Sequence, residues 1–289
     1  MSDKLVKLLL ITVLYVSPFL MLAGCTSTLS SPIPLPQSPA APPTPTPTLT
    51  STPLPAFTSS PTSTATTLPQ TNLCSPLEGV ELAELPQILS NPYQPPRPGY
   101  DDGHHGVDFA YYRFKGRTGI AGLPIHSVMD GWVAAVSDLR LPYGYLIIIE
   151  TPLEMLPPQW LAQIHLPQPE PTVLPAPAMI CPPPPVLNYD SSRRSLYLLY
   201  AHMQEAPGLH IGQPVQCGQP IGLVGTSGES VQEHLHLETR LGPSGARFEG
   251  SMGFYGSQRN DAEAGLYCLW RVSGLFQMVD PLHLLTIQP

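Results

Sequence analysis

The residues of this chain that could carry out chemistry are histidines and an aspartate at short spacings. His234 and His236 lie two positions apart in the run His-Leu-His-Leu-Glu. Alternate residues of a β-strand point to the same face, so a strand here would direct both imidazoles to one side and the two leucines into a core. Two imidazoles on a rigid strand suit a metal ion or a reacting water. The same pattern also occurs on surfaces, so its partners elsewhere decide its meaning.

A second group of candidate ligands lies in the run Gly-His-His-Gly-Val-Asp-Phe. His104 and Asp108 are four residues apart, about 13 Å in a fully extended chain, which is too far for two ligands of one ion. The segment must therefore bend, and Gly103 and Gly106 give it the freedom to do so. Imidazole and carboxylate are ordinary zinc ligands. His105 has the wrong spacing to Asp108, and we expect it to be a neighbour that points to solvent.

His202 is the third candidate, at the end of the apolar run Leu-Leu-Tyr-Ala. Taken alone, a histidine at the end of an apolar strand is more often structural than catalytic. The remaining histidines match no ligand position, and we interpret them as structural or solvent-exposed: His126, His165, His210 and His283.

The elements that must position these side chains are predicted to be short strands. Apolar runs next to glycines cover residues 133–136, 146–150, 196–202 and 219–225. The clearest helical candidate, residues 81–89, is short and contains Pro86. Short strands joined by Gly-rich turns predict a mainly β domain, either a sandwich or a barrel-like sheet.

Two segments interrupt the predicted strands. Residues 151–190 are rich in proline, and a connection of about 40 residues is long for a hairpin. Residues 242–274 are rich in aromatic side chains. Either segment could line a groove or be a surface elaboration, and whether the first one gates a groove is left open.

The order of the motifs, His-x3-Asp, then Tyr-Ala-His, then His-x-His, resembles the lysostaphin/LytM family of zinc metallopeptidases. The runs at residues 122–133, 218–228 and 280–282 resemble further parts of that family. The resemblance covers roughly residues 103–285, apart from the two insertions. It implies a mainly β fold: an antiparallel β-sheet core of the LytM, or duplicated-hybrid-motif, type with an open groove and two long insertions.

Carried over residue by residue, the resemblance implies that His104, Asp108 and His236 hold zinc (Zn2+) and that His202 and His234 are catalytic. It implies a zinc-dependent endopeptidase that hydrolyses peptide bonds in peptidoglycan stems or crosslinks. A zinc-bound water would be the nucleophile, with His202 and His234 as acid/base and oxyanion stabiliser. Which of the two is the general base, and which peptide bond is cut, stay open.

Two other functions remain as alternatives. The same fold could serve as a non-catalytic cell-wall-binding or amidase-activating module, although all five site residues are present. The chain could also capture metal, but that function typically shows a His-rich tract, and the sequence has none.

The N-terminal residues predict export. Lysines precede an apolar run, and the following Leu-Ala-Gly-Cys resembles a bacterial lipobox. We expect residues 1–24 to be a lipoprotein signal peptide, with Cys25 lipidated and holding the protein on the outer side of a bacterial membrane. A plain signal peptide or an uncleaved helix is the alternative. Residues 25–71, rich in Pro, Ser and Thr, predict a disordered tether, and residues 72–289 the zinc peptidase domain.

Composition limits the partners. The 289 residues carry a formal net charge of −8 and no clustered basic run, so we expect no nucleic-acid partner. The expected partners are peptidoglycan and, through Cys25, a membrane; the oligomeric state is left open. An exported chain permits disulfides, and we expect at least one, without a defined pairing, among Cys74, Cys181, Cys217 and Cys268.

Overall fold

The computed structural model describes residues 69–97, 100–164, 166–167 and 179–287. The chain divides into two units, Met1–Thr62 and Ser63–Pro289, and the first lies outside the described residues. The predicted signal peptide, the predicted lipidation site Cys25 and the predicted tether up to residue 68 also lie outside them. Thr71, the last residue of that tether, is buried, and its hydroxyl donates to the Asp130 carboxylate over 3.0 Å. No helix in the described part is long and apolar enough to cross a membrane.

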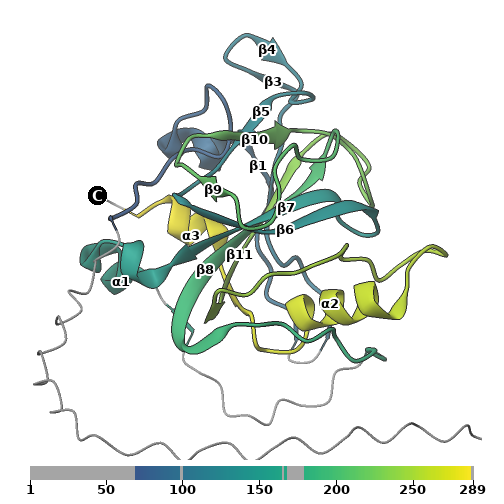
Figure 1. Cartoon of the computed structure of the whole chain (residues 1–289). Coiled ribbons are helices and arrows are strands. Elements are labelled where there is room, and N and C mark those ends of the chain that lie inside the picture. Colours follow the sequence, from purple (N-terminus) through teal and green to yellow (C-terminus); the bar gives the residue numbers. More distant parts are fainter. Residues whose placement is uncertain (1–68, 98–99, 165, 168–178, 288–289) are drawn as a thin grey trace, which may run out of the picture. The chain divides into compact units, whose positions relative to one another are not determined.

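The core of the described part is an antiparallel sheet of eight strands (Figure 1). Its spatial order is β1 (Leu89–Asn91), β2 (Val107–Phe109), β11 (Leu235–Ser244), β8 (Asp190–Met203), β7 (Gly144–Pro152), β6 (Gly131–Arg140) and β9 (Pro214–Val215), with β12 (Gln277–Val279) paired to β11. Two smaller sheets pair β5 (Pro124–His126) with β10 (Pro220–Leu223) and β3 (Arg113–Phe114) with β4 (Arg117–Thr118). The predicted mainly β fold with an antiparallel core is confirmed.

The central strands β7 and β8 are buried on both faces. In β7, Leu146 and Ile148 join one apolar cluster, whereas Ile147 and Ile149 join another. This alternation follows from the two-residue period of a strand. The cluster that contains Ile147, called the first cluster below, is covered by α1 (Pro158–Gln163) and α3 (Pro281–Leu285). The cluster that contains Leu146, called the second cluster, is covered by α2 (Asp261–Arg271) (Figure 1).

Three of the predicted strands fall within β6, β7 and β8, and the fourth, residues 219–225, contains the shorter β10. The predicted helix at 81–89 is the 3-10 helix η1 (Leu82–Ile88), and Leu89 already belongs to β1. Pro86 lies inside η1, where its missing N–H removes one possible helical hydrogen bond.

The first insertion is more structured than a proline-rich loop. β7 continues to Pro152, and the 3-10 helix η2 (Leu153–Met155) and α1 follow. Leu156, Trp160 and Ile164, spaced four residues apart, are all buried in the first cluster. This spacing is typical of one helix face, a signal that the neighbouring prolines obscured.

The second insertion covers a face of the sheet and is not a surface elaboration. β11 continues to Ser244, so the added segment begins later than expected. Its helix α2 starts at a capping box formed by Asn260 and Glu263. Leu266, Tyr267 and Trp270 on this helix are almost fully buried in the second cluster.

Two disulfides restrain the described chain, so the expectation of at least one bridge is confirmed. Cys74 pairs with Cys217, and Cys181 pairs with Cys268. The second bridge connects the two insertions with a Cα–Cα distance of 5.9 Å. The described parts of both insertions are therefore held to each other as well as to the sheet.

Gly106 leads to the first prediction, because it lies directly against β11. A Cβ atom at this position would lie 2.3 Å from the carbonyl oxygen of Leu237. We expect Gly106→Ala to lower the free energy of unfolding by roughly 1–3 kcal/mol through overpacking, as measured by denaturant unfolding. The matched control is Gly208→Ala, since a Cβ there meets nothing within 4 Å. Equal unfolding midpoints for the two variants would contradict the packing argument.

Candidate metal centre

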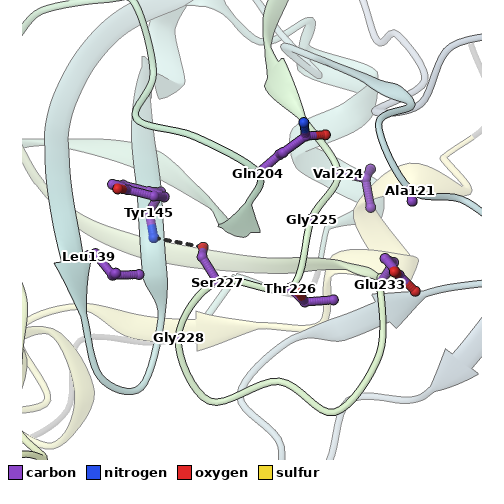
Figure 2. A pocket seen from close by; sticks show the side chains of 10 residues that line it. All are labelled: Ala121, Leu139, Tyr145, Gln204, Val224, Gly225, Thr226, Ser227, Gly228 and Glu233. Atoms are coloured by element: carbon purple, nitrogen blue, oxygen red, sulfur yellow. Dashed lines mark hydrogen bonds between the residues drawn. The ribbon is translucent and has the colours of Figure 1, made fainter.

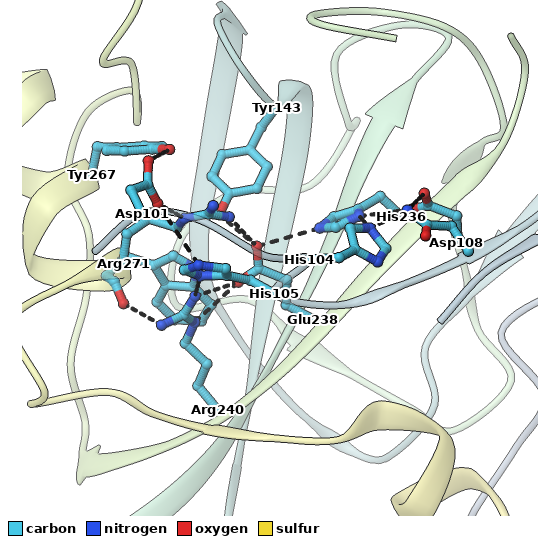
Figure 3. Close-up of polar contacts among 12 residues, drawn as sticks. Asp101, His104, His105, Asp108, Tyr143, His236, Glu238, Arg240, Tyr267 and Arg271 are labelled. Carbon is cyan, nitrogen blue, oxygen red and sulfur yellow. Dashed lines mark hydrogen bonds and ion pairs between the residues drawn. The ribbon is translucent and has the colours of Figure 1, made fainter. Parts of the chain in front are cut away.

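Three ligand-type side chains converge where β2 meets β11. The antiparallel register places His236 directly opposite Asp108. Asp108 Oδ1 lies 2.8 Å from His236 Nδ1 and 3.1 Å from His104 Nε2, and the two nitrogens are 3.2 Å apart. Within the described residues, these three form a group whose ligand atoms all lie within 4.8 Å of one another. The predicted metal ligands are therefore brought together, as Figure 3 shows for all three.

The segment from His104 to Asp108 bends at His105 and Gly106, as expected, and Gly103 turns the chain just before it. This glycine has a φ of +75°, and a Cβ here would lie 2.4 Å from the carbonyl oxygen of Gln94. Backbone hydrogen bonds in both directions then join His104 to Gln94. The bend brings the imidazole of His104 beside β11.

The ring nitrogens that face away from the cluster have their own partners. His104 Nδ1 donates to the carbonyl oxygen of Pro92 over 2.9 Å, and His236 Nε2 lies 3.3 Å from Glu238 Oε1. The second oxygen of Asp108 accepts from Asn91 Nδ2 over 3.1 Å. Such outer hydrogen bonds typically orient metal-ligating imidazoles and carboxylates. Two imidazole nitrogens and one carboxylate oxygen held in this way fit a zinc ion.

His202 and His234 lie beside this cluster, with ring centroids 4.6 Å apart. His202 Nδ1 donates to the carbonyl oxygen of Ser227 over 2.7 Å, so Nε2 of the neutral ring carries the lone pair. His234 Nε2 lies 3.5 Å from Asp108 Oδ1. His202 also has a φ of +59°, a left-handed conformation that costs about 1 kcal/mol or more in residues other than glycine. All five predicted site residues thus occupy one site.

The charges of the site follow from burial and hydrogen bonding. Burial raises the pKa of Asp108, but hydrogen bonds from His104 and His236 outweigh it and hold that pKa well below its usual range. Burial lowers the pKa of His236, yet its contacts with Asp108 and Glu238 prevail and raise it to about 9. Burial, with the neighbouring His236, lowers the pKa of His202 to about 3. His202 is therefore neutral at pH 7.

His105 does not point to solvent, and that expectation was wrong. Its side chain is only 1% exposed, and Nδ1 accepts a hydrogen bond from Arg240 Nη2 over 2.8 Å. His104 faces the cluster, whereas its neighbour His105 faces the interior. Burial, followed by the nearby Arg271 and Arg240, lowers the pKa of His105 to about 2.

Glu238 and Arg240 also belong to this region, although sequence reasoning assigned them no role. Both are fully buried, on the same face of β11 as His236. The signal was the strand period itself, because residues 236, 238 and 240 alternate along one strand. The other histidines lie apart from the cluster: His210 is exposed, His126 contacts Glu78, His283 contacts Gln163, and His165 lies outside the described residues.

Three hollows in the surface are lined partly by residues close in the chain to His202 and His234. A cavity of about 520 Å³ is lined by Tyr145, Gln204, Ser227 and Glu233, among others (Figure 2). A second cavity of about 420 Å³ shares Glu233 with it, and a third of about 370 Å³ shares Leu139 and Gly228. Gln204 follows His202 by two residues and Glu233 directly precedes His234, so two residues that line the largest of these three cavities are near these histidines in the chain.

Comparison with known proteins identifies the family that the site resembles. Residues 189–247 match Peptidase family M23. This segment contains His202, His234 and His236, whereas His104 and Asp108 precede it. The M23 match confirms the predicted resemblance to lysostaphin/LytM-type peptidases. No curated protein matches the sequence.

The chain also resembles solved structures, with low overall similarity. The chain is 22% identical to a mutant of the catalytic domain of the prophage-encoded M23 protein EnpA from Enterococcus faecalis, covering 55% of this chain and 82% of that one, with a TM-score of 0.31. It is 18% identical to the catalytic domain of the antimicrobial peptidase lysostaphin from Staphylococcus simulans, covering 56% and 86%, with a TM-score of 0.32. Because these scores lie below 0.5, the M23 match and the site residues carry the functional argument.

The buried neutral histidines predict that acid destabilises the metal-free domain. His202 and His105 have folded-state pKa values of about 3 and 2, whereas the unfolded chain takes up protons near pH 6.5. Their stabilising contribution is therefore present above pH 6.5 and lost as the pH falls, by roughly 1.5 kcal/mol each at pH 5. The raised pKa of His236 adds no further change below pH 6.5, because its proton is already bound in both states.

Denaturant unfolding between pH 6.5 and 5 measures this loss. We expect His105→Gln to reduce the pH dependence by about half, since one of two responsible groups is removed. His210→Gln, at an exposed position, should leave it unchanged. A wild-type stability that stays constant over this pH range would contradict the assignment.

Proposed function

We propose that the folded domain is a zinc-dependent endopeptidase that hydrolyses peptide bonds in the stems or crosslinks of peptidoglycan. One observation carries the proposal: His104, Asp108 and His236 meet within 4.8 Å of one another, with His202 and His234 beside them. The M23 match over residues 189–247 supports a peptidase.

In this proposal, His104 Nε2, His236 Nδ1 and Asp108 Oδ1 hold the zinc ion. Their outward-facing atoms are already hydrogen-bonded to Pro92, Glu238 and Asn91, as expected for oriented ligands. When bound, zinc would supply a Lewis acid for the substrate carbonyl and lower the pKa of a water.

His202 and His234 serve as the acid/base and as the oxyanion stabiliser. With Nδ1 of His202 donating to Ser227 and Nδ1 of His234 facing the carbonyl oxygen of Gln232, each ring keeps Nε2 for the reaction. One histidine accepts the proton of the attacking water and returns it to the leaving amine. The other, when it is protonated on both ring nitrogens, donates a hydrogen bond from Nε2 to the developing oxyanion.

The row of adjoining cavities provides room for an extended peptide. It passes Glu233, next to His234, and Ser227, which contacts His202. Tyrosines line its outer parts, with Tyr111 and Tyr112 at one end and Tyr255 at the other. We propose that this row is the open groove expected from the sequence.

We further propose that the protein is exported and lipid-anchored through Cys25 on the outer side of a bacterial membrane. Cys25 and the proline-rich segment after it lie outside the described residues, so the support for this proposal is the sequence. A tether confines an enzyme near an immobile polymer and raises its effective concentration there.

Substitutions of His234 and His236 distinguish a residue that transfers protons from a residue that binds zinc. We expect His234→Ala to retain zinc at one ion per chain and to lose turnover by roughly 10²–10⁴-fold, because general acid–base catalysis contributes about that much. His236→Ala should lose both zinc and turnover. Atomic absorption measures the metal, and hydrolysis of a peptidoglycan peptide measures turnover.

His210→Ala serves as the matched control, because His210 is exposed and is not one of the five site residues. It should retain both zinc and turnover. Equal zinc loss in His234→Ala and His236→Ala would contradict the assignment of His236 as a ligand and His234 as a catalytic residue.

Digestion of purified peptidoglycan tests the substrate. Residues 63–289 form one compact unit, and we expect this unit to release peptide fragments that disappear when a chelator is present and return when zinc is restored. Mass spectrometry of the fragments identifies the bond. A folded, zinc-loaded protein that binds peptidoglycan but releases no fragment would overturn the enzymatic proposal in favour of the wall-binding alternative.

A further inference from the structure

A buried carboxylate lies directly behind the metal centre. Glu238 is fully buried, and its Oε1 atom lies 3.3 Å from His236 Nε2. The same oxygen accepts a hydrogen bond from Tyr143 Oη over 2.6 Å and one from Arg271 Nη1 over 3.2 Å. Figure 3 shows Glu238 between His236 on one side and the arginines on the other. The oxygen that faces His236 is therefore held from two other directions.

The second oxygen of Glu238 is held just as firmly. It accepts from Arg240 Nε over 3.0 Å and from Arg240 Nη2 over 2.9 Å. It also accepts from Trp270 Nε1 over 2.8 Å. Arg240 and Trp270 are themselves fully buried, so the carboxylate has little freedom to rotate away from His236.

Arg271 extends this network to the segment that carries His104. Its Nε donates to Asp101 Oδ1 over 2.5 Å, and Asp101 lies three residues before His104. Tyr267, also on α2, donates to the other oxygen of Asp101 over 2.7 Å. One helix from the second insertion thus contacts the supports of two candidate ligands.

We propose that Glu238 and Arg271 are positioning residues of the metal centre. Glu238 keeps a proton of His236 on Nε2, so that Nδ1 is the nitrogen left to bind zinc. Arg271 holds Glu238 and Asp101 together, and thereby aligns His236 with the segment that leads to His104. This inference rests on the proposed zinc site and adds that the inserted helix α2 is part of its support.

Two arginines that join α2 to the rest of the domain offer a matched comparison. Arg271 contacts Glu238 and Asp101, whereas Arg140 on β6 contacts Glu263 of α2 at 3.1 Å and lies outside the Glu238 network. Arg271→Met removes two ion pairs that hold the helix and Arg140→Met removes one, so both should lower the melting temperature. Only Arg271→Met should weaken zinc binding.

The experiment measures the zinc dissociation constant of the full-length protein by chelator competition, with the melting temperature of each variant recorded. We expect about a 10–100-fold weaker zinc affinity for Glu238→Gln and for Arg271→Met, the usual effect of losing an outer partner of a metal ligand. Arg140→Met should keep the wild-type affinity. Equal affinities for Arg271→Met and Arg140→Met, or a wild-type affinity for Glu238→Gln, would overturn the inference.

A measurement on the wild-type protein avoids variants that fail to fold. In zinc-loaded protein, ¹⁵N NMR of the His236 ring should find the proton on Nε2, and a proton on Nδ1 would overturn the inference.

Zinc affinity also separates this inference from the proposed function. Protein that binds zinc through this network but cuts no peptidoglycan leaves the positioning roles standing, whereas protein that binds no zinc at this site overturns both.

Discussion

The pairing register of β2, β11 and β8 is the constraint on which the site depends. It sets His236 opposite Asp108 on one side and opposite Ala201 on the other, next to His202. A slip of one residue would turn every side chain of β11 to the opposite face. Leu235 and Leu237, both fully buried, oppose such a slip, because burial of a leucine side chain contributes about 2 kcal/mol. The apolar residues thus hold the polar ones in register.

The polar face of β11 carries buried charges, and the second insertion supplies partners for them. Glu238 and Arg240 are fully buried, and buried charges are unfavourable unless they are paired and hydrogen-bonded. Helix α2 supplies Trp270 and Arg271 to Glu238, while Arg240 also donates to the carbonyl oxygen of Trp270 over 2.6 Å. The helix therefore covers an apolar face of the sheet and completes a buried polar network. The disulfide between Cys181 and Cys268 ties this helix to the first insertion.

Much of the site was predictable because its signals are local. The two-residue period of a strand relates His234 to His236, and the glycines around His104 indicate a bend. The same period also contained Glu238 and Arg240, but a charged residue on a strand usually faces solvent. The sequence gives no sign that a helix more than twenty residues later would cover that face. For the same reason, the burial of His105 could not be inferred from its spacing to Asp108.

What the sequence by itself determined is the set of chemical groups and the local geometry of each segment: the five site residues, the short strands and the order of the motifs. The tertiary structure decided which segments lie together. It chose one of three cysteine pairings, turned His105 inward, and placed Arg271 between Glu238 and Asp101. The physical reason is that these contacts join residues far apart in the chain, and their free energy depends on burial and charge compensation that exist only once the sheet and α2 have packed.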